Sequence, residues 1–457
     1  MSKKLLQVDF LQGNLLRNMA VFAVPLMLTS IIQLLFNAAD IMVVGKFGSD
    51  VALAAVSSTT SLIHLVINFF IGLSIGTNVV VSRAVGANNS DEASKAVHTA
   101  IFLALLGGLF SGTLGFSASE KALLLMDTPE DVIGQATSYI QIYFLGAPGI
   151  LIYNFGSSIL RSIGDSKRPM YFMTVSGIVN IGLNLILVIV FNLDAVGVAI
   201  ATTVSNYVAA ALTVISLTKI DGPCRFFFKM IGLDKKSAVN IVRIGVPSGI
   251  QSCLFSISNT LIQSSINTFE TVAMSGNAVS QNIESFINTS TNAAAQAAMT
   301  FTSQNLGAKK HERIRPVYYN ALILSLMIWF SLSGLAFIFK TPLMSLYTNS
   351  SDVIMYATLR FMIMVPCYFI GGFMDVTTCT LRGLGCSLPP MIVSVIGVCV
   401  FRVAWISLVF SALKSLTSIY ISYPISWFIT FAVSALIYFI LSKKKIQEII
   451  QEKTLEH

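Results

Sequence analysis

The chain has 457 residues, of which 54% are hydrophobic and 11% are charged, and its mean hydropathy is +0.77. A soluble domain carries about 25% charged residues, so this composition excludes a soluble globular protein and indicates one that crosses a lipid bilayer many times. The formal net charge of +8 is then expected to act on lipid headgroups and on orientation in the membrane, and no nucleic-acid partner is expected.

The two ends and the cysteines add little chemistry. The N-terminal residues lack a short apolar core followed by a small-residue cleavage site, so we expect no cleaved signal peptide. The tripeptide Leu455-Glu456-His457 resembles an expression-vector remnant and is set aside. Neither the six cysteines nor the four histidines have metal-ligand spacing, so we expect no cofactor.

The first apolar stretch, 23–48, predicts a membrane-spanning helix with Pro25 near one end and the carboxylate of Asp40 inside the apolar run. Four polar residues recur on one face of this helix: Thr29, Gln33, Asn37 and Asp40. A carboxylate at membrane depth costs about 2.5–3.5 kcal/mol, so chains that keep one usually use it. We therefore expect a functional role for Asp40, the alternative being a hydrated residue near the interface.

Apolar stretches recur along the rest of the chain. A span needs about 20 apolar residues, which gives about twelve predicted spans and an all-α integral membrane protein. They lie near residues 15–44, 51–80, 92–117, 132–160, 168–192, 196–218, 238–268, 272–304, 314–339, 352–380, 388–411 and 417–441.

The chain also repeats itself at a separation of about 221 residues, as expected of an internal duplication in a transporter. Three motif pairs carry the repeat: Val24-Pro25 with Val246-Pro247, SRAVGA (82–87) with SQNLGA (303–308), and LRSIG (160–164) with LRGLG (381–385). Each half holds an even number of spans, so the repeat is parallel. We expect two pseudo-symmetric six-helix bundles around a central cleft.

Basic residues gather in alternate loops, which by the positive-inside rule places both termini in the cytoplasm. The expected divisions are a cytoplasmic N-terminus (1–13), an N-lobe (14–218), a cytoplasmic linker (219–236), a C-lobe (237–442) and a cytoplasmic tail (443–457).

Polar side chains form long stripes on the second, seventh and eighth spans. Stripes of this length favour a water-filled cleft over the alternative, interhelical hydrogen bonds worth about 0.6 kcal/mol each. Besides Gln33 and Asn37, the candidate cleft residues are His64, Asn68, Asn259, Gln263, Gln281, Glu284, Asn288 and Asp375. The acids Glu284 and Asp375 either attract a cationic substrate or carry a proton, or each pairs with Arg360 or Arg402.

Asn180 and Asn184 share one face of the fifth span, and the sixth opens with the small residues 197–203. With Asp40 and a threonine hydroxyl, the two amides offer oxygen ligands for a hard monovalent cation, or a setting that holds a proton on Asp40. Small-residue packing with asparagine hydrogen bonds is the alternative.

In the order and spacing of these motifs, nearly the whole chain resembles the multidrug and toxic compound extrusion (MATE) transporters of the NorM-like kind. The carrying segments are residues 24–48, the three repeated pairs, NIGLN (180–184) and GVAIATT (197–203). The resemblance implies two six-helix lobes and efflux of amphipathic, often cationic compounds in exchange for Na⁺ or H⁺.

The resemblance also implies roles for single residues. The functional carboxylate falls on Asp40, the helix-bending proline on Pro25, and the cation ligands on Asn180 and Thr202. Where the family has a second carboxylate in the fifth span, this chain has Asn184, which leaves open whether H⁺ or Na⁺ couples. A glutamate that some members carry in the seventh span has no counterpart around Phe255.

We therefore expect a cation-coupled antiporter for organic cations, acting as a monomer in the bacterial inner membrane. The alternative is a lipid-precursor flippase of the wider superfamily, which the near absence of basic residues at depth disfavours. An intramembrane enzyme would need a nucleophile with its base, paired carboxylates or a metal set, and the sequence has none of these patterns.

Overall fold

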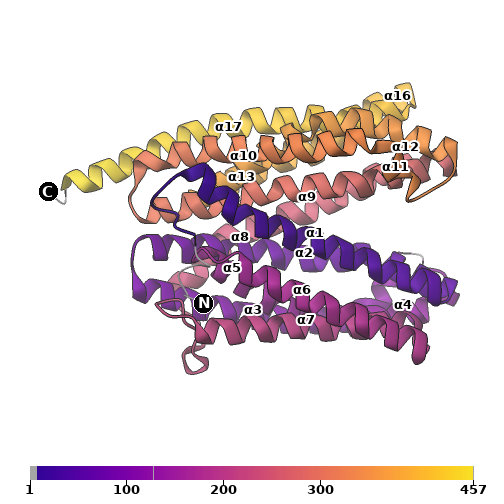
Figure 1. The fold of residues 1–457 in the computed structure, drawn as a ribbon, viewed down its shortest axis with the longest axis horizontal. Coiled ribbons are helices and arrows are strands. Elements are labelled where there is room, and N and C mark those ends of the chain that lie inside the picture. The colour runs from indigo at the N-terminus through magenta and orange to yellow at the C-terminus, as the bar shows by residue number, and fades with distance from the viewer. Residues whose placement is uncertain (1–7, 127, 456–457) are drawn as a thin grey trace. The chain divides into compact units, whose positions relative to one another are not determined.

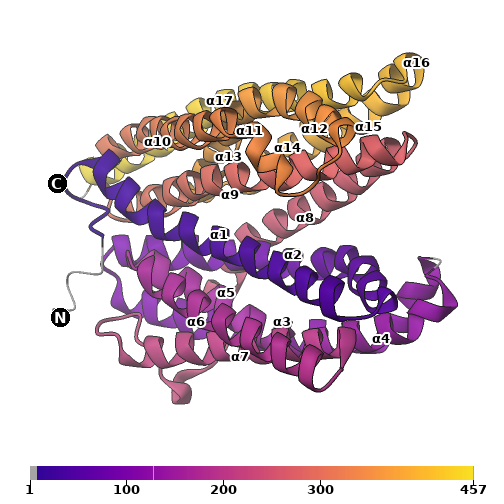
Figure 2. The ribbon, with the colours of Figure 1, turned by 45° about the vertical axis from the view of Figure 1, so that its right-hand side comes forward.

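A computed structural model of the chain describes residues 8–126 and 128–455, and throughout these ranges the regular structure is helical, without a strand. Residues 1–7 of the expected cytoplasmic N-terminus and Glu456-His457 of the C-terminal tripeptide lie outside the described residues. The helices form two compact units, which share the chain almost equally. Figure 1 and Figure 2 show the helices in two views.

Unit 1 comprises Leu28–Gly249 and the segment that ends at Val8. Its helices are the later part of α1 (Leu15–Phe47), α2 (Asp50–Gly86), α3 (Ser90–Leu125), α4 (Glu130–Leu145), α5 (Ala147–Ser162), α6 (Lys167–Asn184), the π-helical η2 (Leu185–Val190), α7 (Asp194–Lys219), the short 3₁₀ turn η3 (Phe228–Met230) and the first part of α8 (Lys235–Ile266). Within this unit α6 lies against α7, and α5 packs on α2, α3 and α7.

Unit 2 comprises Asp9–Met27 and Ile250–His457. Its helices are the remaining parts of α1 and α8, then α9 (Thr271–Gly307), α10 (His311–Ile338), α11 (Lys340–Ser345), α12 (Ser351–Met364), η4 (Val365–Cys367), α13 (Tyr368–Gly383), α14 (Leu388–Ser394), η5 (Val395–Val400), α15 (Phe401–Trp405), η6 (Ile406–Phe410), α16 (Ser411–Leu413) and α17 (Leu416–Leu455). Here α9 packs against α10, α12 and α13.

Most of the predicted spans pass a test for length and apolar character. Ten helical stretches pass alone, and α4 with α5 passes as an eleventh span that bends by 42°. The bend falls at Gly146, just before Pro148, within the single span predicted near 132–160. Helix α9 has the length of the span predicted near 272–304, but its polar stripe makes it less apolar than the other spans. The all-α, multi-spanning, two-part architecture is thus confirmed.

The duplicated motifs form duplicated turns. Gly164 (φ +88°) and Gly385 (φ +85°) end the LRSIG and LRGLG segments in a left-handed conformation that glycine adopts without steric cost. Each of these glycines donates its backbone N–H to the carbonyl of the arginine three residues earlier. Asn88 and Lys309 likewise share φ +53° after the second motif pair. The sequence repeat therefore records a repeat in backbone conformation.

Helices α1 and α8 each contribute to both units. The chain passes from unit 2 to unit 1 after Met27 in α1, and from unit 1 to unit 2 after Gly249 in α8. Pro25 and Pro247 lie inside these helices, each two residues before the crossing point. Because proline removes one helical hydrogen bond and crowds the preceding turn, both helices are weakest near the place where they change units.

Glycines set the close approach of α2 and α8 inside unit 1. A Cβ on Gly72 would lie 2.4 Å from the Cα of Gly249, and one on Gly76 would lie 2.1 Å from the carbonyl oxygen of Ile241. Such backbone contact is typical of membrane helices that associate through small residues. These positions hold the first part of α8 in unit 1.

Candidate functional site

A carboxylate in the C-terminal third of α1, that of Asp40, is joined to polar side chains of α6 and α7. The Nδ2 of Asn184 donates a short hydrogen bond to Oδ1 of Asp40 and a second, of 3.2 Å, to Oδ1 of Asn180. Thr202 closes the ring, because its hydroxyl donates to Oδ2 of Asp40 at 3.5 Å and accepts from Nδ2 of Asn180 at 3.3 Å. The four residues predicted from spacing and resemblance therefore lie together.

Local packing aims Asp40 at α6. Phe36 lies one turn before Asp40 and close to Gly177. A Cβ added to Gly177 would lie 1.5 Å from the ring of Phe36. The bare glycine lets α1 approach α6, and Asn180 and Asn184 follow it at helical spacing on the same side. The asparagine amides consequently meet the carboxylate inside unit 1.

The Asp40 cluster has two further electrostatic features. Among the described residues, no lysine or arginine is a partner of Asp40, whose contacts are neutral amides and a hydroxyl. The buried Oδ1 of Asn184 accepts no hydrogen bond. A carboxylate without a fixed cation, beside an amide oxygen with a free lone pair, is a donor set that suits a hard monovalent cation or a proton.

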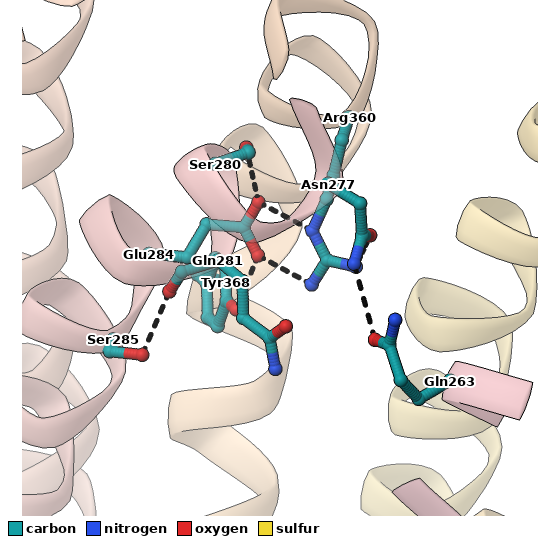
Figure 3. Close-up of polar contacts among 8 residues, drawn as sticks. All are labelled: Gln263, Asn277, Ser280, Gln281, Glu284, Ser285, Arg360 and Tyr368. Carbon is teal, nitrogen blue, oxygen red and sulfur yellow. Dashed lines mark hydrogen bonds and ion pairs between the residues drawn. The ribbon is translucent and has the colours of Figure 1, made fainter. Parts of the chain in front are cut away.

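Unit 2 contains a different carboxylate cluster, which Figure 3 shows. The Glu284 carboxylate of α9 faces the guanidinium of Arg360 from α12, with Nε–Oε1 and Nη2–Oε2 distances of 3.0 and 2.8 Å. Ser280 donates to Oε1 at 2.7 Å and Tyr368 to Oε2 at 3.0 Å. Glu284 is 1% exposed and Arg360 is 3% exposed, so this is a buried, bidentate ion pair.

The same network reaches one further predicted residue. Arg360 donates from Nη1 to Oδ1 of Asn277 at 2.8 Å, and Asn277 donates to Oε1 of Gln263 at 3.3 Å. The sequence left open whether Glu284 serves a cleft or pairs with an arginine, and the geometry is that of the pair. Its partner is Arg360.

A second buried arginine, Arg402 of α15, lies close to two aromatic side chains of α17. Its guanidinium carbon is 4.0 Å from the ring centre of Tyr423 and 5.9 Å from that of Trp427, and its Nε donates to Ser426. The guanidinium carbon of Arg360 lies 5.6 Å from the ring centre of the same Tyr423. No acidic side chain in the described ranges forms an ion pair with Arg402.

The other predicted residues are dispersed. Asp375 of α13 is half-buried, hydrogen-bonded to Asn292 and electrostatically coupled to Arg382, neither of which was its predicted partner. Asn68 is also half-buried, and Pro25 is buried inside α1. The remaining candidates are exposed on their helices: Gln33, Asn37, His64, Asn259, Gln281 and Asn288. The predicted stripe on α9 thus divides into buried Asn277 and Glu284 and exposed Gln281 and Asn288.

Sequence reasoning missed the tyrosines around both carboxylates. Tyr139 and Tyr143 of α4 interact electrostatically with Asp40, and Tyr368 bonds to Glu284. Tyrosine is common at membrane interfaces, so its type alone gives no signal. Across the described residues, no group of three or more histidine, cysteine, aspartate or glutamate side chains is arranged to hold a metal ion.

Comparison with known proteins agrees with this two-unit helical fold. The MatE family model matches residues 25–186 and 247–408, one match for each repeat. The chain is 28% identical to the probable multidrug resistance protein YoeA of Bacillus subtilis, covering 95% of this chain and 96% of that protein. It is 24% identical to the probable multidrug resistance protein NorM of Thermotoga maritima, over 82% of each chain.

Among solved structures, a transporter of the MOP superfamily from Pyrococcus furiosus has a TM-score of 0.88 at 21% identity, covering 98% of this chain and 99% of that one. At this identity the likeness concerns the fold. Because the family model covers both repeats, the chain belongs to the MATE family of transporters, as the sequence motifs predicted. It is a multi-pass membrane protein of that family.

Proposed function

We propose that the chain is an antiporter that exports amphipathic, mostly cationic organic compounds in exchange for H⁺ or Na⁺ by alternating access. The observation that carries the proposal is the Asp40 cluster, a membrane-depth carboxylate held by Asn180, Asn184 and Thr202 without a fixed cation among its described partners. The printed names of the relatives YoeA and NorM, both probable multidrug resistance proteins, support the cargo class.

In the proposed mechanism, Asp40 alternates between a cation-bound and an empty or protonated state. A ligand shifts a conformational equilibrium only through different affinities for the two states. Pro25 lies on the same helix, two residues before the crossing point of α1, and Asp40 lies beyond that point. Occupancy of Asp40 would therefore bias the conformation of α1 around Pro25 and, through it, access to the cargo.

We assign cargo contact to polar side chains that are exposed or half-buried on membrane-spanning helices. Amides, a carboxylate and an imidazole in a hydrocarbon environment are costly unless they line a wet path or meet a ligand. The proposed cargo-contacting residues are Gln33, Asn37, His64, Asn68, Asn259, Gln263, Gln281, Asn288 and Asp375. None of them is a lysine or an arginine, which favours cationic over phosphate-bearing cargo.

We further propose that the chain works as a monomer in the bacterial inner membrane with both termini in the cytoplasm. The basic loops support this orientation through the positive-inside rule. A cysteine introduced into the tail as Lys444→Cys, in a chain whose six native cysteines are replaced by serine, tests it with a membrane-impermeant thiol reagent. Labelling of this cysteine from outside intact cells would reverse the assignment.

Ethidium efflux from proteoliposomes, with Na⁺ and pH gradients imposed separately, tests the proposed function. Efflux driven by Na⁺ alone would make the cluster a sodium site despite its single carboxylate. Efflux driven by pH alone would make Asp40 a proton carrier. If neither gradient changes the rate of ethidium efflux, in protein that still binds ethidium, the result would contradict coupled antiport and favour the flippase alternative.

A further inference from the structure

The Glu284 carboxylate has no lone pair left for a ligand. A carboxylate offers about four acceptor sites, and Glu284 uses two on each oxygen. Oε1 accepts from Arg360 and Ser280, and Oε2 accepts from Arg360 and Tyr368. Figure 3 shows these donors arranged around the carboxylate. A cation that approaches Glu284 must therefore displace a resident donor.

The surroundings of Glu284 are also positive. Two guanidinium groups, Arg360 and Arg402, share the ring of Tyr423 at 5.6 and 4.0 Å, while Glu284 is the single acid among the described residues that is bonded to either. Aromatic faces stabilise such buried cations, most strongly where water is excluded. An incoming cation would meet one excess positive charge in a medium of low dielectric constant, which repels it.

The internal repeat shows where Arg360 stands. The flanking motif pairs fix a separation of about 221 residues, which places Arg360 at the position that Tyr139 holds in unit 1. The same fold position thus holds a neutral phenol in unit 1 and, in unit 2, a fixed cation that is bonded to the Glu284 carboxylate.

We propose that Arg360 is a resident counter-ion that closes Glu284 to exchangeable cations, so that unit 2 contains a latent site for a small monovalent cation such as Na⁺. Removing the guanidinium leaves the Glu284 carboxylate with Ser280, Tyr368 and the adjacent oxygen of Asn277. These groups form an oxygen-rich setting for the cation. The proposal goes beyond the proposed function, because it holds whichever ion couples at Asp40.

The test is equilibrium binding of radioactive Na⁺ to the purified full chain in detergent, at alkaline pH so that a released carboxyl is ionised. All variants carry Asp40→Asn, which removes the unit 1 carboxylate from the measurement. We expect Arg360→Gln and Arg360→Met each to bind an additional equivalent of Na⁺ over the Asp40→Asn parent. Arg360→Lys, which keeps the positive charge, should gain none, and adding Glu284→Gln to Arg360→Met should abolish the gain.

A second measurement covers variants that are too unstable for binding work. Thermal unfolding is compared in sodium chloride and in choline chloride at equal ionic strength. Sodium should raise the melting temperature of Arg360→Gln relative to choline, and the difference should vanish once Glu284→Gln is added. A folded Arg360→Gln chain with neither additional Na⁺ binding nor a sodium-specific rise would overturn the proposal, as would a gain that survives Glu284→Gln.

Discussion

The two units descend from one repeat, but they treat a buried carboxylate in opposite ways. In unit 1, Asp40 is held by neutral amides and a hydroxyl, and the buried Oδ1 of Asn184 accepts no hydrogen bond. In unit 2, Glu284 has all its acceptor positions filled, two of them by Arg360. The charge of Asp40 is left to be neutralised by an exchangeable cation, whereas the charge of Glu284 is neutralised by a side chain of the protein, that of Arg360.

This difference shows that the two repeats place their buried carboxylates on different helices. The repeat position of Asp40 in α8 falls at Leu261 or Ile262, both apolar, and the acid of unit 2 stands instead on α9. With its charge on another helix and fixed by an ion pair, unit 2 is suited to a constant structure. Unit 1 is suited to a variable occupancy.

The sharpest way to break the comparison is Asp40→Asn. The amide keeps the size and hydrogen-bonding capacity of the side chain but removes the charge that a coupling cation neutralises. We expect gradient-driven ethidium efflux from proteoliposomes to fall to that of protein-free vesicles, while thermal unfolding in detergent stays close to that of the parent chain. Undiminished efflux would move the coupling site away from unit 1.

Glu284→Gln tests whether the ion pair of unit 2 is structural. Removing one partner leaves Arg360 buried without its counter-charge, so we expect the free energy of unfolding to fall by about 3–5 kcal/mol. The double change Glu284→Gln with Arg360→Met removes both charges and should recover most of this loss. The measurement is unfolding of the full chain in detergent. A double variant as unstable as the single would assign the stability to other contacts of Arg360.

Asn184→Asp restores a second carboxylate beside Asp40 and makes the two units still less alike. A negative charge added within a few ångströms of a bound cation attracts that cation strongly. Repulsion between the new carboxylate and Asp40 offsets part of this gain. We expect the Na⁺ concentration for half-maximal efflux to fall by about tenfold, which corresponds to about 1.4 kcal/mol. Asn282→Asp, the same chemical change at an exposed position of α9 outside the proposed cargo contacts, is the control and should leave this concentration unchanged.

Tyr423→Leu removes the ring shared by the two arginines of unit 2. The loss of cation–π contact in a dry environment is expected to cost about 2 kcal/mol of unfolding free energy. Tyr423→Phe keeps the ring and should cost less than about 1 kcal/mol, because only the hydroxyl is lost. Equal effects of the two changes would show that the hydroxyl, rather than the aromatic face, supports Arg402.

The smallest effect is expected from Thr202→Val. The hydroxyl lies 3.5 Å from Asp40, a long hydrogen bond, so its loss should weaken apparent cation affinity by about 0.5–1 kcal/mol, or about two- to fivefold. Thr203→Val is the matched control, since Thr203 donates to the carbonyl of Ile142 outside the cluster. An effect as large as that of Asp40→Asn would mean that Thr202 binds the ion directly.

Much of unit 1 was predictable from the sequence because polar residues are rare in apolar helices. Asp40, Asn180 and Asn184 stand out by type, and helical spacing fixes which face each occupies. The duplicated glycines at 164 and 385 were visible as motifs, and the structure gives their reason in a shared positive φ. Where residue type and period together constrain a position, the sequence was sufficient.

The clusters of unit 2 were less predictable because spacing within one helix does not choose a partner on another. Arg360 and Arg402 were equal candidates for Glu284, and only the packing of α12 against α9 decides for Arg360. Asp375 interacts with Asn292 and Arg382, which no periodicity indicated. Nor does a repeat reveal that α1 and α8 change units, because a repeat records ancestry and not contact.

The exchange of helix segments also sets the order of biogenesis. Unit 1 includes residues 235–249 of α8, so it is incomplete until the ribosome has passed the middle of the chain. Unit 2 includes Asp9–Met27, which are among the first residues synthesised and must wait for α9, where Phe301 and Asn305 contact Phe10, before their final packing forms. If the chain is cut into two fragments between α7 and α8, each fragment lacks a piece of its own unit, and the other fragment carries that piece. They should accumulate in the membrane only when co-expressed.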